Sequence, residues 1–224
     1  KIYWADDVPK AWTGTPPADL LTVAERTKFT RTVSTLQLHE WIAALKWRTE
    51  FLHTVSMFVS PLRKVAPAMV LANPRVTSPA QARQSGKPVV FLMGNIHPPE
   101  SEAAEALMLV ARDLALGKHP DILTKLVVMI APVYNVDGTD TFVTQDGGLG
   151  SETPYVQGVR ENSQGLDLNR DAVKLANEVE TLVSKGPGMS CLPRKGVREI
   201  LGIVSVLIPR AAIRPSITML EVPA

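Results

Sequence analysis

The sequence has little of several features that mark particular classes of protein. Only one of its 224 residues, Cys191, is a cysteine, so no disulfide can form within the chain. The longest apolar runs, Leu126 to Val133 and Ile200 to Ile208, have the length of a strand, whereas a membrane-spanning helix needs about 20 apolar residues. The net charge of +2 argues against a nucleic-acid-binding protein, which needs a concentrated basic face. We therefore expect no membrane span and no nucleic-acid partner.

The composition is otherwise that of a globular domain, with 45% apolar and 21% charged residues. Residues 1–26 contain three prolines and little periodicity, which predicts an N-terminal leader. Residues 27–185 are predicted to form the folded domain. Residues 186–224 contain five prolines and five basic residues against two acidic ones, and this shift in composition marks them as a divergent C-terminal tail.

Apolar periodicity predicts an α/β domain. A helix is expected from Thr35, where Ser34 or Thr35 can cap it, and short strands are expected over 53–59 and 68–72, before a loop over 73–87. Two continuous apolar runs, 89–93 and 126–133, have the pattern of strands buried on both faces. A helix is expected between them, over about 100–116. Its predicted inward stripe consists of Ala103, Ala106, Leu107, Val110 and Leu114.

The order strand, helix, strand implies a parallel crossover, and hence a mixed, largely parallel sheet with helices on both faces. Polar residues follow each of the two buried runs. His97 and Glu100 come after the first run, and Tyr134-Asn135-Val136-Asp137-Gly138 follows the second. Because sites in open α/β sheets lie at the carboxyl ends of the strands, both clusters are expected at one edge.

His97 and Glu100 offer a nitrogen and a carboxylate that zinc accepts as ligands. On its own, however, this H-x-x-E spacing is a weak signal. A histidine at a strand end and a solvated glutamate at a helix N-terminus, where the helix dipole favours negative charge, explain it as well.

Three further motifs strengthen the metal interpretation. In chain order, G-N-I-H-P-P-E at Gly94 is followed by P-V-Y-N-V-D-G at Pro132, R-E-N at Arg160 and G-L-D-L-N-R at Gly165. Over roughly residues 27–185 the chain resembles the zinc carboxypeptidase family, the metallocarboxypeptidase A-like peptidases. The resemblance implies a carboxypeptidase-like catalytic domain, a Zn²⁺ cofactor, and the C-terminus of a peptide or protein as substrate.

The resemblance also implies roles for individual residues. His97 and Glu100 match the first two zinc ligands, and Arg160 matches the arginine that polarises the scissile carbonyl and holds its oxyanion. Asn169 and Arg170 match the pair that binds the terminal carboxylate of the substrate, for which a guanidinium fork is well suited. An ion pair of Arg170 with Asp167 or Asp171 is the structural alternative.

Other residues near these motifs have a structural interpretation. Asp137 and Gly138 are interpreted as a turn residue and a left-handed glycine. The remaining histidines, His39, His53 and His119, are interpreted as structural or surface residues.

The family pattern breaks in the C-terminal part of the chain. A catalytic zinc needs three protein ligands, and in the family the third is a histidine beyond the asparagine–arginine pair. No histidine follows His119. The general-base glutamate of the family has no clear counterpart either, since Glu199 and Glu221 are the only glutamates after 185. We therefore expect the family domain to be interrupted near Lys185, leaving its sheet incomplete at the C-terminal side. An intact domain with a divergent C-terminus is the alternative.

Three functional hypotheses follow from the sequence. The chain is either a zinc-dependent carboxypeptidase-like hydrolase or a catalytically dead domain that binds peptide C-termini without cutting them. An amide deacylase of the same superfamily is the third possibility, although the Y-N-V-D-G turn and the long N-terminal region favour the peptidase. The resemblance also favours an exported protein.

Overall fold

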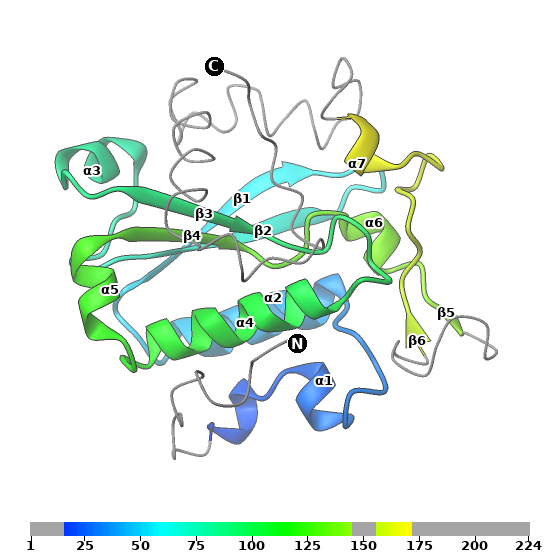
Figure 1. Ribbon diagram of the computed structural model, residues 1–224, viewed down its shortest axis with the longest axis horizontal. Coiled ribbons are helices and arrows are strands. Elements are labelled where there is room, and N and C mark those ends of the chain that lie inside the picture. The colour runs from blue at the N-terminus through cyan, green and yellow to red at the C-terminus, as the bar shows by residue number, and fades with distance from the viewer. Residues whose placement is uncertain (1–15, 145–155, 172–224) are drawn as a thin grey trace, which may run out of the picture.

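The computed structural model describes residues 16–144 and 156–171. Four strands form one sheet in the order β1-β2-β4-β3 (Figure 1). The β1–β2 and β2–β4 pairs are antiparallel, and the β3–β4 pair is parallel. The predicted α/β fold with a mixed sheet is thus confirmed, with its parallel part at β3 and β4. The strands of this sheet are β1 (Leu52–Val59), β2 (Val65–Leu71), β3 (Val89–Met93) and β4 (Val127–Ala131).

The two longest described helices, α2 (Thr35–Lys46) and α4 (Glu102–Ala115), lie on the same face of the sheet (Figure 1). Helix α2 begins where the sequence predicts, because the Gln37 backbone N–H donates to Ser34 Oγ at 3.2 Å. The smaller elements are η1 (Ala18–Leu20), α1 (Val23–Arg26), α3 (Pro79–Gln84), α5 (Pro120–Lys125), α6 (Val136–Thr139), α7 (Leu168–Asp171) and the short strands β5 (Val143–Thr144) and β6 (Val156–Gln157).

The segment over 73–87, predicted to be a loop, contains helix α3. Ser78 caps this helix by accepting a hydrogen bond from the Gln81 backbone N–H at 3.2 Å, and Pro79 occupies its first turn. Proline is well tolerated there because the first-turn N–H has no partner within the helix. The prolines that suggest a loop therefore also fit a helix start.

The two apolar runs differ in burial, although the sequence predicts the same environment for both. All five residues of β4 are buried, as expected of a central strand. In β3 the first four residues are half-buried, and Met93 is exposed. The reason is position, because β3 lies at the edge of the sheet that the described residues form.

Helix α4 turns a partly different face to the core from the one predicted. Leu114 is buried and Leu107 packs against the core, as predicted, whereas Ala106 and Val110, predicted to point inward, are exposed. The buried face also carries a charge, because the Arg112 guanidinium pairs with both oxygens of Glu25, at 2.7 and 2.9 Å. This ion pair joins α4 to α1. The buried apolar residues of α4 are Ala104, Met108, Ala111, Leu114 and Ala115.

The segment Ala18–Arg26 packs against the core of the domain. Leu20 and Val23 are buried within the main apolar cluster, and the Leu20 carbonyl accepts a hydrogen bond from Trp41 Nε1 at 2.9 Å. The domain boundary after residue 26 stays a prediction. The tail over 186–224 and the interruption expected near Lys185 lie outside the described residues.

The carboxylate of Glu105 on α4 is buried, and its burial destabilises the fold. Neither of its oxygens has a hydrogen-bond partner among the described residues. Burial raises the pKa of Glu105, and the negative charge of Glu25 raises it further. The nearby Thr22 hydroxyl lowers the pKa of Glu105 and so partly offsets this rise. It does not form a hydrogen bond of normal geometry with either carboxylate oxygen.

We expect Glu105→Gln to increase the free energy of unfolding at neutral pH by on the order of 1 kcal/mol, because it removes an unpaired buried charge. Since the pKa of Glu105 is raised on folding, wild-type stability falls as the pH rises from the unfolded value of 4.5 through the folded value. Urea denaturation of both proteins at several pH values measures this. Their stabilities should converge at acidic pH, and an equal difference at every pH would contradict the prediction.

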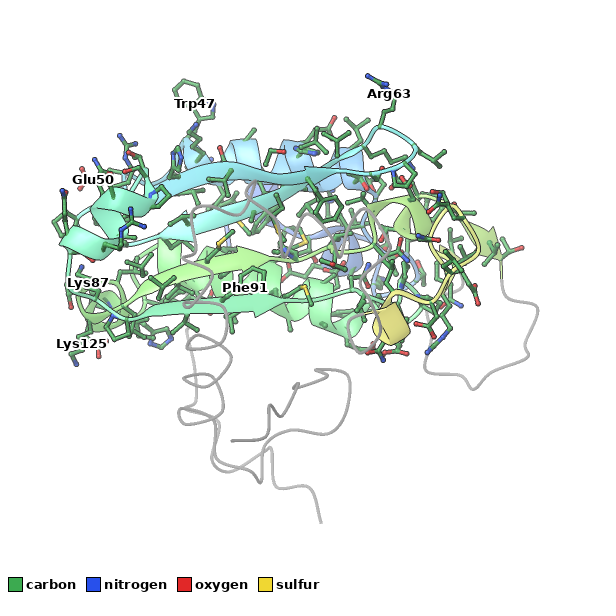
Figure 2. The ribbon with its side chains drawn as sticks, turned by 90° about the horizontal axis from the view of Figure 1, so that it is seen from above. Trp47, Glu50, Arg63, Lys87, Phe91 and Lys125 are labelled. Carbon is green, nitrogen blue, oxygen red and sulfur yellow. The ribbon has the colours of Figure 1, made fainter. Side chains whose placement is uncertain are left out.

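Figure 2 distinguishes the two ends of the sheet. Lys87 and Lys125, which precede β3 and β4, mark one end. Arg63, in the turn between β1 and β2, marks the other, where α6 and α7 also lie. The carboxyl ends of the parallel strands β3 and β4 point to this second end, where the sequence predicts the site.

Candidate functional site

Backbone hydrogen bonds join the turn after β3 to the turn after β4. The Tyr134 N–H donates to the Gly94 carbonyl at 3.0 Å, and the Asn135 N–H donates to the Asn95 carbonyl at 3.2 Å. Gly94 allows this close approach, since an added Cβ would lie 3.0 Å from the Pro132 carbonyl oxygen and 2.9 Å from a Leu107 methyl group. The motifs that contain His97 and Asp137 thus meet at one edge, as predicted.

The segment that carries Arg160 docks on α6. The Val159 N–H donates to the Gly138 carbonyl at 2.9 Å, and Asn135 Nδ2 donates to the Arg160 carbonyl at 3.2 Å. Beyond it, the Asn162 side chain accepts from two backbone N–H groups, those of Gln164 and Leu166, each at 3.0 Å. This local loop turns the chain back, so that Asp167 lies beside His97.

His97 is buried, with only 3% of its surface exposed, and both its ring nitrogens face carboxylates. Nδ1 lies 3.0 Å from Glu100 Oε1, and Nε2 lies 2.8 Å from Asp167 Oδ1. A carboxylate can only accept a hydrogen bond, so a ring nitrogen that carries a proton donates it to the carboxylate that it faces. The two contacts together fix the orientation of the ring, with Nε2 towards Asp167 and Nδ1 towards Glu100.

Arg160 contacts the same two carboxylates. Its Nη2 and Nε lie 2.9 and 3.2 Å from Asp167 Oδ2, and its Nη1 lies 3.3 Å from Glu100 Oε1. Burial alone would raise the pKa of Asp167, but hydrogen bonds from His97, Arg160 and the Asn169 backbone N–H outweigh it and lower this pKa to about 2. Asp167 is therefore ionised throughout the physiological range.

The structure brings four of the five predicted site residues into one region. His97, Glu100 and Arg160 are joined by the contacts above, and the Asn169 backbone N–H donates to Asp167 Oδ1 at 3.0 Å. Arg170 belongs to α7, but its side chain lies outside the described part of the structure. Its assignment to the substrate carboxylate, and the alternative ion pair with Asp167 or Asp171, both stay predictions.

The remaining histidines have other surroundings. His39 Nε2 lies 3.0 Å from the Val65 carbonyl oxygen. His53 lines an apolar pocket with Val89 and Val127, near the starts of β3 and β4 and thus at the opposite end of the sheet. Burial lowers the pKa of His53, and nearby cationic side chains lower it further. His119 precedes α5 and is exposed.

The donor atoms present fit two positions of a zinc site. A tetrahedral zinc with bonds of about 2.0–2.1 Å needs its ligand atoms roughly 3.3 Å apart, close to the 3.0 Å between His97 Nδ1 and Glu100 Oε1. Asp167 on Nε2 supplies the carboxylate partner that metal-bound histidines usually have. Within residues 16–144 and 156–171, however, no three His, Cys, Asp or Glu side chains form a group that could hold a metal ion.

Comparison with known proteins assigns the chain to a family. The family model described as zinc carboxypeptidase matches residues 70–184, more than half of the chain. The chain belongs to the zinc carboxypeptidase family. Carboxypeptidase D of Mus musculus is 37% identical over 91 residues, which cover 38% of this chain. The human Carboxypeptidase D is 36% identical over a segment of the same length.

The matches cover only part of the related proteins. The aligned segment spans 7% of the length of Carboxypeptidase D. A crystal structure from Burkholderia mallei, assigned as a carboxypeptidase, superimposes with a TM-score of 0.50 at 18% identity, covering 77% of this chain and 37% of the other. At this identity the superposition supports the carboxypeptidase fold alone. No helix of the described residues is long and apolar enough to cross a membrane.

Asp167 was not predicted to belong to the site, and was named only as an alternative ion-pair partner of Arg170. In the structure it holds both His97 and Arg160. The general tendency of metal-binding histidines to donate their second N–H to a carboxylate could have indicated such a partner. Asp167 lies within the G-L-D-L-N-R motif, and is therefore the acidic residue which that tendency would have favoured.

Proposed function

We propose that this zinc carboxypeptidase domain binds zinc through His97 and Glu100 and acts on the C-terminal ends of peptides. The observation that carries the proposal is the arrangement of His97, whose Nε2 is held by Asp167 at 2.8 Å while Nδ1 lies beside Glu100 at 3.0 Å. Membership of the family supports the choice of zinc. Bound zinc would supply Lewis acidity for hydrolysis of the peptide bond.

The other residues would bind and orient the substrate. Arg160 presents a guanidinium at the rim of the site, with 40% of its side chain exposed, where it can donate hydrogen bonds to the carbonyl oxygen that becomes negative. Asn169 and Arg170 follow at the start of α7 and would anchor the terminal carboxylate. Asp167 would act through His97 and Arg160, by fixing the orientation of both side chains.

The alternative function is binding of peptide C-termini without cleavage. It is favoured by the finding that, among the residues that the structure describes, no three His, Cys, Asp or Glu side chains form a group that could hold a metal ion. A site with two protein ligands would hold zinc weakly. The amide deacylase remains a third candidate, separable from the peptidase by testing acylated amino acids as substrates.

His97→Ala tests the metal part of the proposal. We expect the purified chain to bind one equivalent of zinc and the variant to bind it at least about 100-fold more weakly, because loss of a ligand should exceed the 10–100-fold cost of losing an outer-shell partner. His119→Ala, which removes an exposed histidine outside the site, serves as the matched control. Zinc affinity is measured by competition with a chromogenic chelator.

Turnover distinguishes the two main functions. A peptide with a free C-terminus and the same peptide with an amidated C-terminus are incubated with the zinc-loaded chain. Cleavage of the free peptide alone supports the carboxypeptidase, and saturable binding without cleavage supports the binding domain. A wild-type chain that binds no zinc would contradict the metal proposal.

A further inference from the structure

Glu100 Oε1 lies close to two nitrogen atoms. His97 Nδ1 lies 3.0 Å from it and Arg160 Nη1 lies 3.3 Å from it. In the proposed function, Glu100 gives a carboxylate oxygen to the metal. The guanidinium of Arg160 therefore lies where it neutralises a metal ligand, and a cation already occupies the neighbourhood of the proposed zinc.

Asp167 divides its two oxygens between the same two residues. Oδ1 contacts His97 Nε2 at 2.8 Å, whereas Oδ2 contacts Arg160 Nη2 at 2.9 Å and Nε at 3.2 Å. His97, Glu100, Arg160 and Asp167 thus form a closed ring of contacts. One carboxylate orients both the proposed metal ligand and the arginine, through different atoms.

We propose that Arg160 and the metal compete for Glu100, so that metal binding frees Arg160 Nη1 while Asp167 retains Nε and Nη2. This inference rests on the proposed function, since it takes His97 and Glu100 as the metal ligands. Two cations next to one carboxylate oxygen repel each other. The contact that breaks, between Arg160 Nη1 and Glu100 Oε1, is the longest in the ring. Both side chains are about 40% exposed, so this contact is the one most easily replaced.

The exchange would couple metal binding to the availability of Arg160. In the structure, all three nitrogens of the guanidinium (Nε, Nη1 and Nη2) face carboxylates of the chain itself. With metal, Nη1 can donate to a negatively charged oxygen of the substrate, while the remaining contacts keep the side chain in place. Linkage requires the converse as well, so weakening the hold of Arg160 on Glu100 should tighten metal binding.

Arg160→Met and Arg160→Lys in the full chain test the exchange. We expect Arg160→Met to bind zinc about tenfold more tightly than wild type, within the range usual for coupled sites. Lysine keeps the charge but lacks the fork that bridges both carboxylates, so Arg160→Lys should bind zinc with an intermediate affinity. Lys64→Met is the matched control, because it also removes a positive charge, from a lysine that pairs with Asp140 instead of the ring, and should change zinc affinity less than twofold.

The outcomes separate this inference from the function on which it rests. Stoichiometric zinc binding by wild type, with unchanged or weaker binding by Arg160→Met, would overturn the exchange and leave the metal site standing. An affinity of Arg160→Lys equal to that of wild type would attribute the effect to charge alone and would also overturn it. Failure of both wild type and Arg160→Met to bind zinc would overturn the inference together with the proposed metal site.

A second measurement uses the wild-type chain and does not depend on the folding of any variant. Phenylglyoxal reacts with the terminal nitrogens of arginine, and mass spectrometry locates the modified residues. Labelling of Arg160 should become several-fold faster when zinc is added, whereas labelling of Arg48, which pairs with Asp19 on the surface, should stay the same. Unchanged or slower labelling of Arg160 in the zinc-loaded chain would overturn the exchange.

Discussion

Asp137→Ala is expected to lower the free energy of unfolding by about 3 kcal/mol, because it removes a buried acceptor of several hydrogen bonds. Asp137 has no exposed surface. Its carboxylate accepts from Ser60 Oγ at 2.6 Å, from Ser163 Oγ at 2.7 Å and from the Leu62 backbone N–H at 3.2 Å. These donors belong to the β1–β2 turn and to the loop that follows Arg160, so one carboxylate ties both segments to α6.

Urea denaturation of Asp137→Ala beside Asp121→Ala measures the effect. Asp121 is 67% exposed and pairs with Lys125, and removing an exposed partner of this kind should cost less than about 1 kcal/mol. Asp137→Asn keeps the shape and one acceptor, and should fall between wild type and alanine. An Asp137→Ala chain as stable as the Asp121→Ala chain would show that the hydrogen bonds to this carboxylate contribute little.

The same change should weaken the site, although Asp137 does not touch it. Ser163, which Asp137 holds, lies between Arg160 and Asp167 in the chain. Loss of its partner would loosen the loop that carries both side chains. Asp137 is therefore a support for the site, which is more than the turn residue that the sequence suggested.

The sequence was sufficient to predict the edge of the sheet at which the site lies. Apolar runs located β3 and β4, and the polar motifs that follow them were placed at the carboxyl ends of parallel strands. His97, Glu100 and Arg160 could be chosen because the motifs that contain them resemble, in order and spacing, those of the zinc carboxypeptidase family. The contacts between them depend on how the loop over 158–167 folds back, and no local pattern encodes this.

Rotation and burial of the elements were predicted less well, because they depend on partners far away in the sequence. The face of α4 that turns inward is set partly by the ion pair of Arg112 with Glu25, which is 87 positions away. The half-burial of β3 follows from its place in the strand order, and an apolar run alone does not give this order. Apolar periodicity therefore located these elements without fixing their surroundings.

Gly138 was interpreted as a left-handed glycine, and this interpretation was wrong. Its φ is not among the positive values of the described glycines, and it lies within helix α6. Glycine is needed at position 138 because there is no space for a side chain. A Cβ at this position would lie 2.5 Å from the Glu161 carbonyl oxygen and 2.7 Å from that of Val159, which belong to the backbone on either side of Arg160.

Gly138→Ala is therefore expected to destabilise the fold by about 3 kcal/mol, at the upper end of the usual cost of overpacking, because the atoms in the way are backbone and cannot turn aside. The loop of Arg160 would also move away from α6. Gly117→Ala is the informative control, since Gly117 has a φ of +77° but no atom within 4 Å of an added Cβ, so that its cost of roughly 1–2 kcal/mol is purely conformational. Thermal and urea denaturation compare the two variants. Measuring the zinc affinity of both variants then shows whether the metal site is also affected. We expect Gly138→Ala to weaken zinc binding and Gly117→Ala to leave it unchanged.

Equal losses of stability in the two variants would mean that the contact between α6 and the Arg160 loop is not tight.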